Sequence, residues 1–292
     1  MAAENAGAHA PTAGEYIQHH LQHLQMNFSF EGVKQTSIVD FSLFNLDSVF
    51  FSLVLGVIGC IVLWAAARKA TSGVPGRFQA AVEILSEMVE NQAKGVIHNA
   101  KSRKLISPLA LTVFVWIFLM NAMDMLPVDL IPAAWHAAGP ALGFKDYMRV
   151  VPTADLSTTL GLSCSVLFIC LVYNIKIKGL GGWAHELIAA PFGDHWALWP
   201  VNFLMQMIEY LAKTVSHGMR LFGNMFAGEL VFMLIALMGG GWALSATGVG
   251  LAIGHILAGT VWTLFHILVI TLQAFIFMML TLIYTGQAHD AH

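Results

Sequence analysis

Long apolar runs without Asp, Glu, Lys or Arg divide the chain into segments. Three such runs cover residues 48–67, 105–123 and 156–175, and a fourth leaves residues 230–289 free of these charges. About 20 consecutive apolar residues are enough for a helix to span the hydrocarbon core of a bilayer. The three shorter runs therefore predict one membrane helix each, at about 48–67, 105–124 and 156–175.

The C-terminal region has room for two much longer helices. Helix-like composition runs over 201–238, breaks at three consecutive glycines, and continues over 251–285. At a rise of 1.5 Å per residue, the 38 residues of the first segment reach about 57 Å, whereas the hydrocarbon core is about 30 Å thick. Ordinary helix tilts of about 20° do not absorb this excess. We therefore expect a hairpin of two long, steeply tilted helices.

Two other segments have the pattern of surface structure. Residues 76–98 carry apolar and charged side chains with the period of a helix, which is typical of an amphipathic helix on a membrane surface. Residues 1–45 are polar and rich in histidine, and they lack the basic and apolar regions of a signal peptide. We interpret 1–45 as an external N-terminal segment and 46–292 as the membrane domain.

The composition agrees with a membrane protein. Of the 292 residues, 57% are hydrophobic and only 11% are charged, whereas soluble domains carry about 25% charged residues. This does not fit a soluble enzyme or a disordered chain, and the formal net charge of −3 gives no basic surplus for nucleic acid. The fold class predicted is an all-α integral membrane protein with five membrane helices and one amphipathic surface helix.

Basic residues indicate the orientation, because Lys and Arg are enriched in cytoplasmic loops. Seven of the fourteen Lys and Arg residues lie between residues 68 and 104. Lys176 and Lys178 put the end of the third span on the same side, whereas the loop 127–152 balances two basic residues with two acidic ones. We therefore expect an external N-terminus and a cytoplasmic C-terminus.

Four charged residues interrupt the first arm of the hairpin, namely Glu209, Lys213, Arg220 and Glu229. An arginine at the bilayer centre costs at least about 2.5–3.5 kcal/mol, and such residues usually face a protein interior or water and mark an ion path. A structural ion pair between Arg220 and a carboxylate is the alternative interpretation.

Helical spacing separates two polar surfaces on this arm. Residues three or four positions apart share a helical face, and this spacing joins Glu209, Lys213, Ser216 or His217, Arg220 and Asn224. Glu229 follows Arg220 by nine positions, which is about 900° at about 100° per residue, or half a turn out of phase. We therefore expect Glu229 to point away from the Arg220 face, as in a path with two sections.

The second arm carries a matching polar stripe of His255, Trp262, His266 and Gln273, which share a narrow arc because 7 and 11 residues are close to whole numbers of turns. Histidine titrates near neutral pH and relays protons. A neutral core histidine is the alternative for His266 alone, but beside Glu229 a proton relay is equally well supported. We interpret Asp124 as a helix-end charge or as the lining of an outer vestibule.

Other kinds of site are not supported by the sequence. No phosphate-binding G-x-x-x-x-G-K-[ST] loop is present, and His185-Glu186 lacks the second histidine of a zinc protease motif. His19, His20 and His23 have metal-binding chemistry, but their polar segment favours a solvated stretch. Cys60, Cys164 and Cys170 lie in apolar runs, which suggests small buried hydrophobic residues.

Two long motifs resemble subunit a of F-type ATP synthases. Residues 216–229, Ser-His-Gly-Met-Arg-Leu-Phe-Gly-Asn-Met-Phe-Ala-Gly-Glu, resemble the family signature, and residues 265–277, Phe-His-Ile-Leu-Val-Ile-Thr-Leu-Gln-Ala-Phe-Ile-Phe, resemble the last helix of the family. Shorter similar stretches lie at 121–127, 152–155 and 178–182. The resemblance covers roughly residues 40–285. It departs from the family at His217 and Thr214, where family members often have an apolar residue and a proline.

The resemblance implies a non-catalytic stator subunit in a bacterial inner membrane, without cofactor, metal or nucleic acid. Its implied partners are a rotating c-ring, the b subunits of the peripheral stalk, membrane lipid and, indirectly, the soluble ATPase sector. Arg220 would face the ring carboxylate between two half-channels. The expected outer half-channel and ring interface comprise Glu229, His266, Asn224, Gln273 and Asp124. The expected inner half-channel comprises Glu209, Lys213, Ser216 and His217.

Two other classes of protein remain as alternatives. A free-standing transporter would also place charges in its spans, but it would usually contain internal repeats with broken helices, and the sequence has none that we detect. A membrane-embedded enzyme would need an assembled nucleophile or metal set. The sequence does not distinguish H⁺ from Na⁺ as the coupling ion, because the ion-binding carboxylate would lie on the ring.

Overall fold

The computed structural model describes residues 13–27, 40, 42–71, 73–127, 130–138, 148–189, 191–193, 195–240 and 245–289. Five helices within these ranges are long and apolar enough to cross a membrane. They are α2 (Leu46–Arg68), α4 (Ala100–Ala122), α6 (Leu156–Ala189), α7 (Trp199–Gly240) and α8 (Ala246–Gly286). The predicted class of an all-α membrane protein with five membrane helices is therefore confirmed.

Shorter elements join and flank the long helices. The helical ones are α1 (Ala13–His20), α3 (Arg77–Val96), α5 (Leu130–Ala138), η1 (Met123–Met125), η3 (Pro152–Ala154), η4 (Trp196–Leu198) and η5 (Gln287–His289). Strands β1 (Gln25–Asn27) and β2 (Leu43–Asn45) pair antiparallel, with Met26 opposite Phe44. These two strands were not anticipated, because three residues are too few to produce a detectable alternating pattern.

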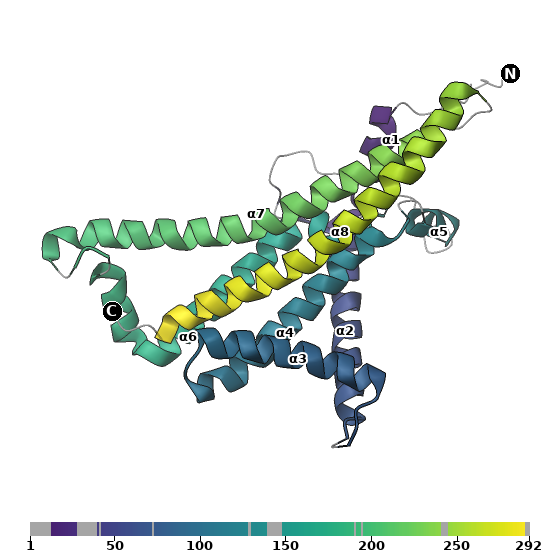
Figure 1. Ribbon diagram of the computed structural model, residues 1–292. Coiled ribbons are helices and arrows are strands. Elements are labelled where there is room, and N and C mark those ends of the chain that lie inside the picture. The colour runs from purple at the N-terminus through teal and green to yellow at the C-terminus, as the bar shows by residue number, and fades with distance from the viewer. Residues whose placement is uncertain are drawn as a thin grey trace.

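The last two helices form the predicted hairpin, and both run across the direction of α2 (Figure 1). Their 42 and 41 residues correspond to about 63 and 62 Å of helix. Helix α8 begins at Ala246, earlier than the expected position 251, because the Ser245 hydroxyl accepts a hydrogen bond from Gly248 N at 3.0 Å. This N-cap satisfies a free N–H group of the first turn, so the glycines that follow continue the helix.

Helix α6 continues well beyond the expected end at residue 175. It bends at Gly179, whose φ of 73° lies in the left-handed region that glycine adopts without steric cost. Across the bend, Lys178 Nζ lies 2.7 Å from Glu186 Oε1. The bend brings the last turns of α6 back toward the start of α7 (Figure 1).

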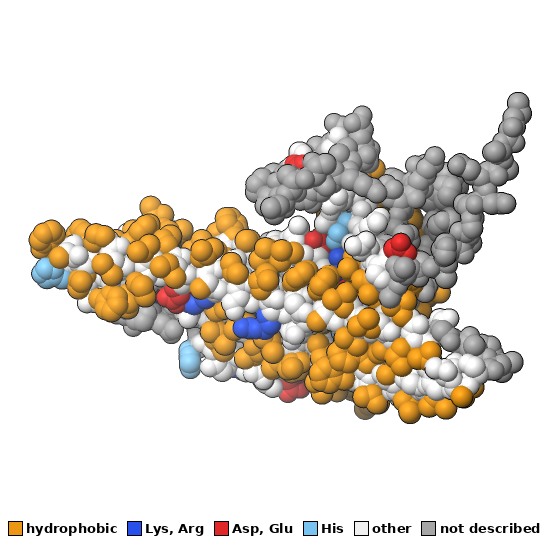
Figure 2. All heavy atoms as spheres, turned by 90° about the horizontal axis from the view of Figure 1, so that it is seen from above, with side chains coloured by type: hydrophobic (Ala, Val, Ile, Leu, Met, Phe, Trp, Pro, Cys, Tyr) orange, Lys and Arg blue, Asp and Glu red, His pale blue; other side chains and the backbone are white. Residues whose placement is uncertain are grey.

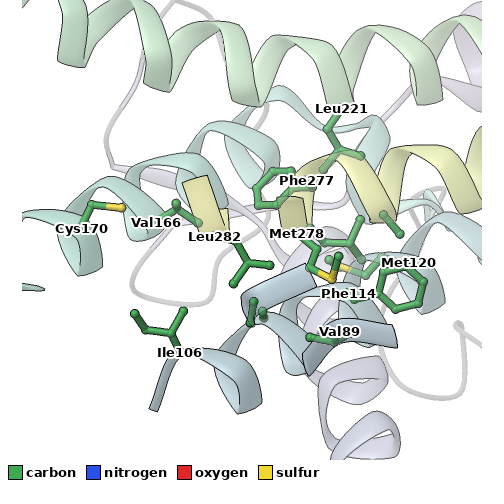
Figure 3. Packing of buried hydrophobic residues seen from close by; sticks show 14 of the residues in the cluster. Val89, Ile106, Phe114, Met120, Val166, Cys170, Leu221, Phe277, Met278 and Leu282 are labelled. Carbon is green, nitrogen blue, oxygen red and sulfur yellow. The ribbon is translucent and has the colours of Figure 1, made fainter. Parts of the chain in front are cut away.

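The core lies where α8 crosses α4, α3 and α7. Phe277, Met278 and Leu282 of α8 occupy its centre, between Leu221 of α7 and Val89 of α3 (Figure 3). Lipid tails are as apolar as leucine, so close packing rather than water exclusion stabilises contacts between membrane helices. The core therefore fixes the hairpin arms relative to the bundle.

One glycine and three cysteines refine this picture of packing. A Cβ at Gly286 would lie 2.6 Å from Val96 Cγ1, so the glycine allows α8 to approach α3. Cys170 is buried as expected, but Cys60 and Cys164 are exposed on α2 and α6. The expectation of burial was wrong for these two cysteines, because an apolar run that faces lipid has the same composition as one that faces protein.

The surface helix and the N-terminal elements lie at opposite ends of the bundle. Helix α3 crosses the lower end of α2 and α4, whereas α1, α5 and the top of the α7–α8 hairpin lie at the upper end (Figure 1). Part of the predicted N-terminal segment 1–45 lies outside the described residues, namely positions 1–12, 28–39 and 41. The same is true of positions 128–129 and 139–147 in the predicted external loop 127–152.

Candidate functional site

A buried arginine–glutamate pair forms the centre of the polar region at the upper end. Glu229 of α7 and Arg149, just before η3, are 7% and 5% exposed. Arg149 Nη2 donates to Glu229 Oε2, and Arg149 Nε donates to Glu229 Oε1 at 3.3 Å. This two-point contact is the geometry that arginine and a carboxylate favour. Glu229 is thus held in place from outside its own helix.

Asp47 at the start of α2 organises the backbone around this pair. Its carboxylate is 1% exposed and accepts hydrogen bonds from Leu24 N at 3.0 Å and from Arg149 N at 3.1 Å. His23 adds a side-chain contact, because its Nε2 lies 2.9 Å from Arg149 Nη1. We define Asp47, His23, Arg149 and Glu229 as the outer cluster.

Sequence reasoning missed three of the four members of the outer cluster. Arg149 is separated from Glu229 by 80 positions, from Asp47 by 102 and from His23 by 126. No helical spacing relates residues so far apart. The one available signal was Arg149 itself, an arginine in a loop with few basic residues, close to the start of a predicted span.

A second buried pair, Asp124 and His266, lies beside the outer cluster. His266 Nε2 is 2.6 Å from Asp124 Oδ2, and the two residues are 1% and 7% exposed. The sequence hypothesis paired His266 with Glu229. In the structure the Asp124 carboxylate contacts His266, and Arg149 is the ion-pair partner of Glu229. Asp124 follows the end of α4, as a helix-end charge would, but it is buried against His266.

Gly228 allows His266 to approach α7. A Cβ at Gly228 would lie 2.3 Å from His266 Cε1, which is shorter than any tolerable contact. On the other sides, the rings of Phe232 and Trp262 lie 5.2 and 6.0 Å from the imidazole, centroid to centroid. The imidazole is therefore enclosed directly beside the helix segment that carries Glu229.

We expect Gly228→Ala to displace His266 from Asp124 and to slow proton-driven ATP synthesis by about tenfold, the factor that corresponds to the loss of a polar contact of about 1.4 kcal/mol. ATP synthesis in energised membrane vesicles measures this effect. Gly161→Ala on α6 is the matched control, because nothing lies within 4 Å of a Cβ there. Equal rates in both variants would contradict the role given to the close approach at Gly228.

Arg220 lies on the opposite, outward face of α7. It is exposed, as are Ser216 and Asn224 one turn before and after it, whereas Glu229 is buried. The half-turn offset expected between Arg220 and Glu229 is thus observed. Among the residues described here, Arg220 makes no hydrogen bond or ion pair, so the structural ion pair that was considered for it is absent from this part of the chain.

Apolar side chains surround Arg220. Val215 and Met219 are each 43% exposed on the same side of the helix. Figure 2 shows hydrophobic side chains along the projecting arm of α7, with a few charged groups between them. An exposed, unpaired cation within an apolar surface is costly in a bilayer unless a partner approaches it. This face is therefore suited to contact with a protein that carries an anion.

A third polar region lies at the other end of the hairpin, where α6, α7 and α8 enclose a cavity of about 990 Å³. Lys213 and His217 line it, together with Ser163 of α6. Lys213 Nζ contacts Glu209 Oε1 at 2.5 Å and Gln287 Oε1 at 3.0 Å.

His217 is buried at the inner end of this cavity. It is 2% exposed, and its ring lies 3.7 Å from Phe277 and 5.8 Å from Tyr284, centroid to centroid. Ser216, its neighbour, faces outward instead. The four residues expected on the inner side are therefore divided: Glu209, Lys213 and His217 surround the cavity, with Glu209 and Lys213 paired, and Ser216 belongs to the Arg220 face.

Gln273 and Asn121 are buried polar residues that lie outside these groups. Gln273 of α8 is 7% exposed, so it belongs to the interior of the bundle and not to the exposed face of Arg220. Asn121 of α4 is fully buried, and within the described residues neither of its side-chain polar atoms has a hydrogen-bond partner. Asn121 precedes Asp124 by three positions, so both lie on the same face of this segment.

A membrane helix bundle with two separated polar regions, and an exposed cation between them on an apolar face, defines an ion-translocating membrane protein. Residues 49–286 match the family described as ATP synthase A chain. The chain is 70% identical to ATP synthase subunit a of Acidovorax sp. (strain JS42), over 98% of this chain and 99% of the relative. It is 47% identical to that of Shewanella piezotolerans (strain WP3 / JCM 13877), over 98% and 99%.

The chain therefore belongs to the ATP synthase A chain family. As a member, it is the proton-translocating subunit of the membrane sector of an F-type ATP synthase and not the nucleotide-binding catalytic subunit. It is a multi-pass protein of the bacterial inner membrane, and it works with the c-ring and the rest of the ATP synthase. The transporter and membrane-enzyme alternatives are excluded.

Proposed function

We propose that this chain forms two offset half-channels that meet only through the c-ring, at Arg220. The observation that carries the proposal is the position of Arg220, which is exposed on α7 between the buried outer cluster and the inner cavity. Among the described residues, the lining of the inner cavity includes no member of the outer cluster, so we take the two regions as separate for a proton. It must therefore cross on a mobile carrier, which is the role of a ring carboxylate.

The outer half-channel comprises the outer cluster and the Asp124–His266 pair. Protons enter near Arg149 and Glu229 and pass His266 toward the ring, with Gln273 and Asn224 along the way. Histidine and carboxylate groups that touch are the usual elements of a proton relay in a membrane. The contact between Gly228 and His266 supports this route, because it brings the two buried pairs to one level of α7.

Arg220 holds each arriving ring carboxylate in its ionised form. A nearby cation lowers the pKa of a carboxyl group, so the carboxylate must release its proton before it passes Arg220. Arginine remains protonated under physiological conditions, whereas a buried lysine can lose its proton. The fixed charge therefore prevents direct proton passage between the half-channels. Each proton that moves down 100 mV contributes about 2.3 kcal/mol.

The inner half-channel is the cavity between α6, α7 and α8. Lys213 and Glu209 form part of its polar wall, and the buried His217, about one turn from Arg220, also lines it. The positive-inside rule orients the chain with the N-terminus in the periplasm and the C-terminus in the cytoplasm. The cavity then opens to the cytoplasm, and the outer cluster faces the periplasm. The exposed faces of the remaining helices contact lipid and the b subunits of the peripheral stalk.

Sided thiol labelling tests the two half-channels. Cys60 and Cys170 are first replaced by serine, and Ser163→Cys or His23→Cys is introduced. A charged, membrane-impermeant thiol reagent is then applied to inverted and right-side-out vesicles. We expect Ser163→Cys, which lines the cavity, to react from the cytoplasmic side, and His23→Cys, in the outer cluster at a side chain that is 16% exposed, to react from the periplasmic side.

The control for this labelling is Cys164, the neighbour of Ser163, which is exposed on the outer surface of α6. In contact with lipid, it should react slowly from both sides in the parent, and it is replaced by serine in the two test variants. Labelling of Ser163→Cys and His23→Cys from the same side would contradict the arrangement of two half-channels.

A further inference from the structure

Within the outer cluster, His23 of the N-terminal segment forms a hydrogen bond with Arg149. The chemistry of the two side chains determines which of them is the donor. His23 Nε2 lies 2.9 Å from Arg149 Nη1. A guanidinium group can only donate, so Nε2 must accept, and the imidazole must be neutral with its hydrogen on Nδ1. That nitrogen lies 3.4 Å from Asp47 Oδ2. The neutral imidazole therefore accepts a hydrogen bond from Arg149, while within the described residues its Nδ1 lies near Asp47 without a hydrogen bond to it.

Protonation of His23 breaks its hydrogen bond with Arg149. With hydrogens on both nitrogens, Nε2 faces the guanidinium N–H groups as a second donor, and two cations then lie within hydrogen-bond distance. Histidine is the side chain that changes charge between about pH 5 and 8. The imidazole is 16% exposed, whereas the carboxylate of Asp47 has no exposed surface. His23 is thus more accessible to external protons than the buried carboxylate of Asp47 beside it.

We propose that His23 is a proton-responsive positioning residue at the outer entrance, one that covers the Arg149–Glu229 pair while neutral and uncovers it when protonated. This inference rests on the proposed outer half-channel. Acid on the external side opens access when protons are available for uptake. Alkaline conditions restore the hydrogen bond to Arg149 and close the same entrance, which limits the return of protons.

The charged groups around His23 favour a local movement of the side chain. Asp47 faces it from α2, Arg149 faces it from the segment before η3, and Glu229 of α7 lies behind Arg149. His20, on the same segment, is bonded to the Tyr16 carbonyl at 2.9 Å. The backbone stays anchored when His23 is protonated, because Leu24 N donates to Asp47 independently of the imidazole.

The test is the dependence of proton-driven ATP synthesis on external pH. The complete ATP synthase is reconstituted in vesicles, and the total driving force is held constant with a potassium diffusion potential. We expect His23→Ala to lose the cover and to exceed the parent rate by about fivefold at alkaline external pH, the factor that one net hydrogen bond corresponds to. We expect His23→Gln, which keeps an acceptor for Arg149 without titrating, to remain slow at acidic external pH.

His20→Ala is the matched control, and its pH profile should follow that of the parent. A purely structural role for His23 would lower the rate of fully assembled complexes equally at every pH in both His23 variants, and this result would overturn the proposal. Profiles of the parent shape in both variants would overturn it as well. The outer half-channel itself is tested separately by Glu229→Gln, so normal transport in that variant would refute the channel rather than the role of His23 alone.

Discussion

Replacement of Arg220 by alanine is expected to abolish proton-driven ATP synthesis. Removal of one partner from a charge pair in a low-dielectric site costs about 3–5 kcal/mol, and each 1.4 kcal/mol is about a factor of ten, so we expect a loss of roughly 100-fold or more. Without the cation, the ring carboxylate keeps its proton as it passes α7. Rotation then no longer depends on which half-channel the carboxylate meets.

Arg220→Lys is the matched variant for this prediction. It keeps a positive charge, but lysine loses its proton more readily in an apolar site and lacks the planar donor fork of arginine. We therefore expect ATP synthesis well below the parent rate but above that of Arg220→Ala, measured in vesicles energised by an acid–base jump. Because Arg220 has no described partner within the chain, both variants should fold and assemble. Failure of assembly would instead indicate a structural role for Arg220.

The second large effect is expected for Arg149→Ala, which leaves Glu229 buried without its partner. Such a break costs about 3–5 kcal/mol, so the complex should contain less of this subunit and unfold at a lower temperature. The double variant Arg149→Ala/Glu229→Gln removes both charges and should recover stability, but it should not recover proton uptake. Thermal unfolding of the purified complex and ATP synthesis measure the two effects separately.

An exposed ion pair serves as the control for the buried Arg149–Glu229 pair. Lys94 and Glu90 on α3 lie 4.0 Å apart, with side chains that are 53% and 36% exposed, and exposed pairs contribute about 0–1 kcal/mol. Lys94→Ala should therefore leave thermal unfolding almost unchanged. An equally small effect for Arg149→Ala would mean that Glu229 does not depend on Arg149. Full proton uptake in the double variant would contradict the place of Glu229 in the outer half-channel.

Most of the fold could be predicted because membrane spans are encoded locally. A charge-free run of sufficient length predicts a span wherever it occurs, and a run of about 57 Å predicts a tilted helix. The details that were missed depend on single capping or bending residues. Ser245 starts α8 early, and Gly179 lets α6 turn without ending.

In the candidate site, too, some relations between residues could be predicted from the sequence and others could not. Helical periodicity separated Arg220 from Glu229 correctly, because both lie on one helix and their relation depends only on spacing. The pairs of Glu229 with Arg149 and of His266 with Asp124 join different parts of the chain. Such contacts follow from the packing of α4, α7 and α8 and not from any local pattern. Only the three-dimensional structure could identify them.

The central claim, that protons pass between the half-channels only on the ring and under the control of Arg220, has one direct test. ATP-driven proton pumping is measured with a pH-sensitive dye in inverted membrane vesicles that carry Arg220→Ala in the complete ATP synthase. We predict ATP hydrolysis without acidification of the vesicle interior. Acidification to the extent of the parent would contradict the claim.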